Sequence, residues 1–182
     1  FKGAYMPSVF LVSDTHFGHA GVCRFLRDDG TKLRPWDDPE KMDEDMIKLW
    51  NDTVRPNDKV YHLGDVVMHR KSLSIMHRLN GDKVLIKGNH DIFKLGDYIP
   101  YFRDIRAYHV MNNMILSHIP IHPESKGRFS ANIHGHLHAN RVKKHDKIDP
   151  WYFNVSVEQI DYKPILFEEV LERIKKQNEE TW

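Results

Sequence analysis

Five short clusters of aspartate, asparagine and histidine are spaced along the chain, and such side chains commonly bind divalent metal ions. The clusters are Asp14-Thr15-His16, Gly64-Asp65, Gly88-Asn89-His90-Asp91, His118 and Gly135-His136-Leu137-His138. Their oxygen and imidazole ligands suit first-row divalent ions, whereas Cys23, the only cysteine, leaves no thiolate set for a structural zinc site. The clusters therefore predict a metal site, provided that the fold brings them together.

Each cluster lies at or just after a segment with the pattern of a β-strand. The predicted strands are 8–13, 59–63, 83–87, 106–110, 114–117, 131–134 and 152–155, and the predicted helices are 19–27, 40–54, 71–79 and a segment that begins at Pro164. Helices alternate with strands early in the chain and strands dominate later, which is typical of a sheet-based α/β domain. Because ligands of α/β sheets bind beyond the carboxyl ends of the strands, the five clusters are expected to gather at one edge of the fold.

Two of the clusters place a pair of candidate ligands two residues apart. Asp14 and His16 form one pair, and His136 and His138 form the other. Side chains two residues apart point to the same face of a strand, so each pair would face one way if its strand continues. The glycines within the clusters would let the backbone turn sharply or pass close to a metal ion.

In type and order, these clusters resemble the motifs of the calcineurin-like metallophosphoesterase family, which run D-x-H, G-D, G-N-H-D, H and G-H-x-H. The phrase SDTHFGH, followed by RPW, YHLGD and GNHD, is similar to small bacterial and phage phosphoesterases of that family. The resemblance extends from about Val9 to Asn154. It implies an α/β fold, a four-layered sandwich of two mixed β-sheets flanked by helices, and the strand prediction is compatible with this fold.

The same resemblance implies a two-metal hydrolase that cleaves phosphodiester or phosphomonoester bonds with a hydroxide held between the ions. The implied metal ligands are Asp14, His16 and His138 for the first ion, Asn89, His118 and His136 for the second, and Asp65 as the bridge between them. Manganese is the expected metal, with iron, nickel, zinc and cobalt as alternatives, because these ligands do not by themselves select one ion.

The resemblance also assigns two catalytic residues in the third cluster. His90 is expected to stabilise the transition state or to protonate the leaving group, rather than to bind metal. Asp91 is expected to orient His90 through the other ring nitrogen. A chain that kept the metal ligands without turnover would instead be a metal-binding scaffold, which is the alternative outside the enzyme class.

Three further side chains are candidates for substrate contact. Arg34 lies in the loop after the first cluster, and a guanidinium group can pair bidentately with phosphate. His19 follows His16 by three residues, and His122 follows the implied ligand His118 closely. No insertion between the clusters is long enough to build a separate capping domain, so the predicted site is open and need not exclude the second substituent of a diester.

The net charge of +1 gives no general attraction for polyanions. A phosphorylated small molecule or a nucleotide is therefore the expected substrate, and nucleic acid is an alternative that the charge does not indicate. Within the enzyme class, a metal-dependent nuclease and a cyclic-nucleotide phosphodiesterase are the rival functions, because this fold serves several phosphoester substrates.

The length of 182 residues fits one domain, predicted over 6–182. Residues 1–5 precede a methionine, Met6, and are interpreted as an artificial extension, with a longer natural start as the alternative. No apolar run approaches the roughly 20 residues that span a bilayer. Together with the single cysteine, this favours a cytoplasmic protein without a membrane partner, and the oligomeric state is not predicted.

Overall fold

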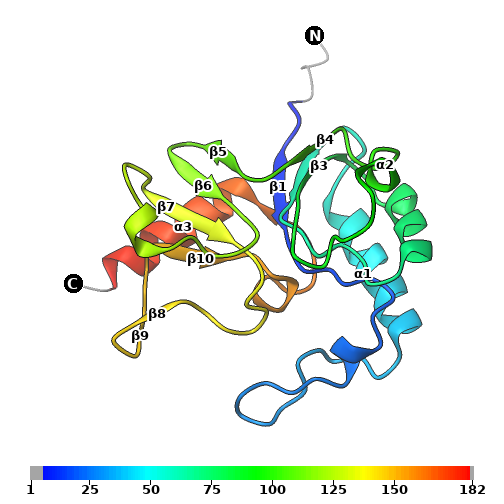
Figure 1. The fold of residues 1–182 in the computed structure, drawn as a ribbon, viewed down its shortest axis with the longest axis horizontal. Coiled ribbons are helices and arrows are strands. Elements are labelled where there is room, and N and C mark those ends of the chain that lie inside the picture. Colours follow the sequence, from blue (N-terminus) through cyan, green and yellow to red (C-terminus); the bar gives the residue numbers. More distant parts are fainter. Residues whose placement is uncertain (1–5, 181–182) are drawn as a thin grey trace.

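A computed structural model describes residues 6–180 as two mixed β-sheets with helices on their outer sides (Figure 1). This arrangement confirms the expected α/β sandwich. The interpretation of residues 1–5 lies outside the described residues. Within the described part of the chain, no helix is both long and apolar enough to cross a membrane.

The first sheet contains the early strands of the chain and has the order β11-β1-β2-β3-β4. Its strands are β1 (Val9–Val12), β2 (Lys59–His62), β3 (Asp82–Ile86), β4 (Asp104–Arg106) and β11 (Ile165–Leu166). The first four run parallel, and β11 pairs antiparallel with β1. Parallel strands are covered on both faces and therefore consist of apolar runs, as in β1, where Phe10, Leu11 and Val12 are all buried.

The second sheet has the order β10-β7-β6-β5. Its strands are β5 (His109–Met111), β6 (Met114–Leu116), β7 (Ala131–His134) and β10 (Tyr152–Asn154). Only β5 and β6 pair antiparallel, and their hairpin turn has Asn112 and Asn113 at φ of 48° and 59°, a conformation that asparagine tolerates better than most residues. A small hairpin, β8 (Lys143–Lys144) with β9 (Lys147–Ile148), stands apart from this sheet.

Helix α1 (Pro39–Thr53) packs its apolar stripe into the core next to the first sheet (Figure 1). Asp38 caps its first turn by accepting the backbone N–H groups of Glu40 and Lys41, and Pro39 suits the first helical position. The buried stripe consists of Met42, Met46, Ile47 and Trp50. The other α-helices are α2 (Leu95–Tyr98) and α3 (Phe167–Glu179). The predicted helix over 40–54 is thus confirmed.

Two predicted helices take a different form. The segment over 19–27 contains only a 3₁₀ helix at Gly21–Cys23, because the chain then folds back in a loop closed by hydrogen bonds from Arg27 N to Thr31 O and from Leu33 N to Phe25 O. The segment over 71–79 is a 3₁₀ helix, Arg70–Arg78, in which the Ser74 hydroxyl donates to a backbone carbonyl and competes with α-helical bonding.

Two other predictions of secondary structure are corrected. The predicted strand over 106–110 is two strands in different sheets, since β4 ends at Arg106 and β5 begins at His109. The intervening residues therefore carry the chain from the first sheet to the second. The final segment forms the edge strand β11 before it becomes α3, so it first completes the first sheet.

Replacement of Trp50 by alanine tests the packing of α1. The Trp50 side chain is 2% exposed, and its Nε1–H donates to the Asn80 carbonyl at 2.8 Å. Removing a buried tryptophan side chain is expected to lower the free energy of unfolding by about 3–5 kcal/mol in urea denaturation. Lys48→Ala, on the exposed side of the same helix, is the matched control and should change it little. Equal effects of the two substitutions would contradict the packing.

Candidate metal centre

The predicted metal ligands follow the carboxyl ends of strands in both sheets. Asp14, Asp65 and Asn89 come after β1, β2 and β3, and the histidine ligands of the second sheet come after β6 and β7. Backbone hydrogen bonds join these ends, from Asp14 N to Gly64 O at 2.9 Å and from Gly135 N to the His118 carbonyl at 2.9 Å. The expected gathering of the clusters at one edge is therefore observed, and the edge is shared by two sheets.

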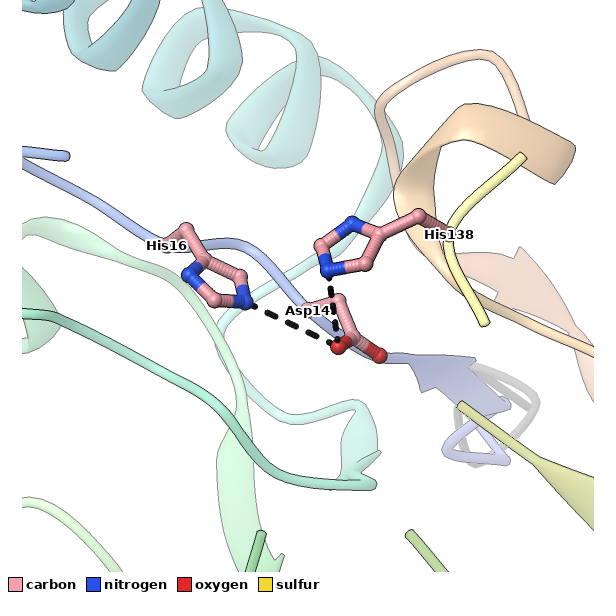
Figure 2. Close-up of side chains that lie close together, drawn as sticks. All are labelled: Asp14, His16 and His138. Carbon is pink, nitrogen blue, oxygen red and sulfur yellow. Dashed lines mark ion pairs between the residues drawn. The ribbon is translucent and has the colours of Figure 1, made fainter. Parts of the chain in front are cut away.

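The first group consists of Asp14, His16 and His138, which could together hold one metal ion (Figure 2). The Nε2 atoms of both histidines lie 3.7 Å from the same oxygen, Oδ1 of Asp14. The other carboxylate oxygen, Oδ2, accepts hydrogen bonds from the Ser13 hydroxyl at 2.6 Å and from the Ser156 hydroxyl at 3.1 Å. Asp14 is thus held through Oδ2, and its buried Oδ1 has no hydrogen-bond partner among the described residues.

The second group consists of Asp65, His118 and His136, with Asn89 beside them. The Asn89 Oδ1 atom lies 2.9 Å from His118 Nε2 and 3.0 Å from His136 Nδ1. His118 Nδ1–H donates to the Leu63 carbonyl at 2.7 Å, which leaves the Nε2 lone pair facing the group. Carboxylate, amide and imidazole donors therefore converge here as well.

Asp65 lies between the two groups. Its Oδ2 atom is 3.5 Å from His16 Nε2 in the first group and 3.3 Å from His118 Nε2 in the second. Its other oxygen, Oδ1, accepts the backbone N–H of His90 at 2.8 Å. One carboxylate oxygen thus faces histidines from both groups, as a residue shared by two ions must.

The electrostatics of the site favour bound cations. Burial by itself would raise the pKa values of Asp14 and Asp65, but hydrogen bonds and charge interactions with the neighbouring histidines outweigh burial and hold both pKa values well below the ordinary range. Burial likewise opposes protonation of His16 and His118, yet the two carboxylates raise the pKa of each ring. A site that attracts protons this strongly, and that buries His16 Nε2 without a hydrogen-bond partner, fits divalent metal ions.

The backbone turns sharply at most of these ligands. Five of them have left-handed backbone, namely Asp14 (φ 58°), His16 (φ 48°), Asp65 (φ 58°), His136 (φ 72°) and His138 (φ 51°). The strands have already ended at these positions, so the two-residue alternation along a strand does not explain why the paired ligands converge. Left-handed turns aim the side chains instead, which corrects the reason for the prediction.

His90 lies at the exposed mouth of the site. Its ring centroid is 5.7 Å from that of His16, with the planes at 65°. The bond from its backbone N–H to Asp65 fixes its position relative to the shared carboxylate. His90 therefore stands next to both groups without belonging to either.

Asp91 was predicted to orient the His90 ring, but in the structure it binds backbone groups instead. Its fully buried carboxylate accepts three backbone N–H bonds, from Asp65 at 2.8 Å, Val66 at 3.0 Å and Gly88 at 2.7 Å. None of the hydrogen bonds among the described residues joins Asp91 to the His90 ring. The carboxylate instead connects the second and third clusters, because it accepts hydrogen bonds from backbone N–H groups in both segments.

The structure separates the three candidates for substrate contact. His19 lies beside the first group, since its ring stacks on that of His16 with centroids 5.4 Å apart. Burial, followed by the nearby charges of His16 and Arg34, lowers the pKa of His19 to about 4, so the ring is neutral at neutral pH. His122 is exposed and caps the 3₁₀ helix Pro123–Ser125, where its Nδ1 accepts the Glu124 N–H at 3.2 Å. No contact of His122 with either ligand group is found among the described residues.

The prediction that Arg34 contacts substrate is wrong. Its side chain has no exposed surface, and its guanidinium group donates to the carbonyls of Asp14 at 2.6 Å and Thr15 at 2.8 Å. It also pairs with the Glu158 carboxylate at 3.0 Å. A cation that is fully buried and bonded in this way cannot reach a phosphate in the site, so Arg34 supports the first cluster from within.

Glu158 is a residue of the site that the sequence did not reveal. Its buried carboxylate accepts the Nδ1–H of His138 at 2.6 Å. Burial would raise the pKa of Glu158, but Arg34 and His138 outweigh burial and lower it. The residue lies in the 3₁₀ helix Val157–Gln159, 20 residues after His138 in the sequence. Ser156, directly before this helix, is the second such residue, since its hydroxyl donates to Asp14. No sequence pattern marks either residue.

A model of the family described as calcineurin-like phosphoesterase matches residues 7–180. The chain is 36% identical over 180 residues to the uncharacterized protein MJ1445 of Methanocaldococcus jannaschii, with 94% of this chain and 93% of that protein covered. The crystal structure of AQ665, a protein of unknown function from Aquifex aeolicus, is similar with a TM-score of 0.65 and 25% identity over 92% of this chain and 99% of that one. A structure described as a novel archaeal phosphodiesterase has a TM-score of 0.46 and 19% identity over 81% and 82% of the two chains. By its clusters, its ligand groups and this family match, the chain belongs to the calcineurin-like phosphoesterase family.

Proposed function

We propose that this protein is a two-metal phosphoesterase that hydrolyses phosphodiesters, and phosphomonoesters less well. The observation that carries the proposal is the position of Asp65, whose Oδ2 atom faces His16 at 3.5 Å and His118 at 3.3 Å. The two ligand groups, with Asp65 between them, would hold two ions, and bound ions would supply an activated water as nucleophile and neutralise charge on the phosphate oxygens. Manganese is the proposed metal, with iron, nickel, zinc and cobalt as alternatives, because nitrogen and oxygen ligands suit first-row divalent ions without selecting one of them.

The protein supplies the remaining chemistry through His90. Its exposed ring lies beside the first ligand group and can donate a proton to the leaving oxygen of the ester. Asp91 holds the backbone that carries His90, since it binds the N–H groups of Asp65 and Gly88. His19 stacks on the His16 ring with centroids 5.4 Å apart and thus lies close enough to the first group to be tested for substrate contact.

The surroundings of the second group support a diester substrate. A shallow cleft of about 350 Å³ adjoins it, lined by Asn89 and His118 together with Lys87 and Ile119. Lys87 is exposed and positively charged, and Ile119 is 52% exposed, so the cleft offers both a cation and an apolar surface. A second substituent on the phosphorus would therefore have room beside the second ion.

Removal of metal tests the central proposal. The purified protein is expected to bind two divalent ions per chain, and excess chelator should abolish hydrolysis until Mn²⁺ is restored. Asp65→Ala should weaken binding of both ions, because its carboxylate faces both groups. Elemental analysis and a phosphate-ester assay measure these effects. Full activity in excess chelator, with no metal found, would refute the metal assignment.

Substitution of His90 tests proton donation. His90→Ala should keep both metal ions but lose roughly 10²–10⁴-fold in kcat on esters with a poor leaving group, the usual effect of removing a positioned acid. The loss should be smaller for nitrophenyl esters, because nitrophenolate leaves without a proton. His145→Ala, at an exposed histidine in the turn of the β8–β9 hairpin, is the control and should match the wild type. A His90 variant as fast as the wild type on every ester would show that the ring is not catalytic.

Comparison of two nitrophenyl substrates tests the preference for diesters. The ratio of kcat/KM for bis-nitrophenyl phosphate to that for nitrophenyl phosphate should exceed one, because the site mouth at Asn89 and His90 is exposed and the adjoining cleft is open. The comparison should be repeated with several metals, since metal identity can change the ratio. Turnover of the monoester without detectable cleavage of the diester would identify a phosphatase instead.

A further inference from the structure

The two ligand groups differ in the hydrogen-bond partner of the histidine ring nitrogen that faces away from the group. In the second group, the ring nitrogen of His118 that faces away binds a backbone carbonyl, that of Leu63. In the first group, the corresponding nitrogen of His138 binds a carboxylate, Glu158, at 2.6 Å. His16, the other histidine of the first group, has no hydrogen-bond partner for its Nδ1 among the described residues. The first group thus depends on one negatively charged support.

That support is itself part of a buried ion pair. The side chains of Arg34 and Glu158 are both 0% exposed, and Nη2 of Arg34 lies 3.0 Å from the oxygen, Oε1, that accepts the His138 bond. A buried charge that loses its partner is strongly destabilising, so each member of the pair holds the other in place. The orientation of Glu158, and hence of His138, depends on Arg34.

Arg34 also binds the backbone of the first cluster. Its Nη1 and Nη2 atoms donate to the carbonyls of Thr15 and Asp14, which lie in the left-handed turn that carries two metal ligands. One guanidinium group therefore connects the backbone of Asp14 to the carboxylate behind His138. No comparable ion pair supports the second group in the described part of the chain.

The loop that supplies Arg34 is anchored near Glu158. Trp36 packs edge-on against Tyr162 with ring centroids 4.9 Å apart, and the Tyr162 hydroxyl donates to the Leu33 carbonyl at 3.3 Å. Tyr162 follows the 3₁₀ helix that contains Glu158. Tyr162 thus joins the loop to the segment after this helix, in addition to the ion pair itself.

We propose that Glu158 and Arg34 are positioning residues for the first metal site alone: Glu158 holds His138 with Nε2 toward Asp14, and Arg34 holds both Glu158 and the Asp14 turn. The inference rests on the proposed two-metal function but concerns metal binding rather than turnover. Carboxylates behind metal-bound histidines fix the ring and make it a stronger ligand, and their loss typically costs about 10–100-fold in metal affinity.

Glu158→Gln tests this assignment, because glutamine keeps the shape of the side chain and removes its charge. Titration of metal-free protein with Mn²⁺, followed by electron paramagnetic resonance, distinguishes an exchange-coupled pair of ions from a single ion. As Mn²⁺ is added to the wild type, the spectrum should change to that of an exchange-coupled pair of ions. The variant should retain a single-ion spectrum over a wider range of Mn²⁺, with affinity at one site reduced about 10–100-fold and affinity at the other unchanged.

Asp43→Asn is the matched control. Asp43 is also a buried carboxylate, 9% exposed, and it accepts the Gly18 N–H at 2.9 Å, but it belongs to neither ligand group. Its substitution should leave both affinities as in the wild type. Thermal unfolding of each variant without metal shows whether the fold survives. If Glu158→Gln does not fold, Arg34→Lys replaces it, since lysine keeps the charge but cannot bind both carbonyls and Glu158, and it should also weaken one site selectively.

Three outcomes would overturn the inference. Unchanged binding of both ions in the Glu158 variant would show that the carboxylate does not position His138. Equal weakening of both sites would show a general structural effect instead of support for the first site. A wild-type protein that binds no pair of ions would remove the proposed function and this inference together, whereas the first two outcomes leave the proposed function intact.

Discussion

Buried negative charge at the strand ends is the constraint on which the rest of the site depends. The side chains of Asp14, Asp65, Asp91 and Glu158 have at most 2% exposed surface, and Arg34 is the buried guanidinium group among them. Carboxylates removed from water are costly unless cations or hydrogen-bond donors compensate them. Asp91 is compensated by three backbone N–H groups and Glu158 by Arg34 and His138. Asp14 and Asp65 retain oxygens that face only histidines, so metal ions are the compensation that their environment requires.

The same arrangement carries a backbone cost. A left-handed conformation costs roughly 1–2 kcal/mol for a residue other than glycine, and five ligands adopt it. The strands approach so closely at these turns that a side chain on Gly135 would collide with Ser13 and Asp14, and one on Gly88 would collide with Asp65. Close packing around the carboxylates therefore requires these two glycines, whereas the sequence suggested that they let the backbone turn sharply or pass close to a metal ion.

The sequence predicted well which side chains converge at the strand ends, because this information is local. A polar pair directly after an apolar strand indicates both the residue type and its position at the sheet edge. Helix α1 was equally predictable, from its cap at Asp38 and its apolar stripe. Arg34, Asp91 and Glu158 could not be assigned in this way. Each of these side chains makes its contacts with segments that are distant in the sequence. Arg34 and Glu158, for example, are 124 residues apart. A loop arginine is equally compatible with binding phosphate and with a buried ion pair, and only the fold distinguishes these alternatives. The strand predicted over 106–110 was wrong for a related reason, since apolar residues suit either sheet and the crossing between sheets leaves no pattern.

The two ligand groups therefore differ in the number of chain segments that support them. The second group is built from the ends of adjacent strands and a backbone carbonyl, so folding of the sheets alone supplies its geometry. The first group has in addition the loop of Arg34 and the 3₁₀ helix of Glu158, which are joined by the buried ion pair. Strand ends thus carry the ligands of both groups, while the loop of Arg34 and the 3₁₀ helix of Glu158 contact the first group. Loops vary more readily than sheets, so variation in this loop or this helix would change the first site without rebuilding the second.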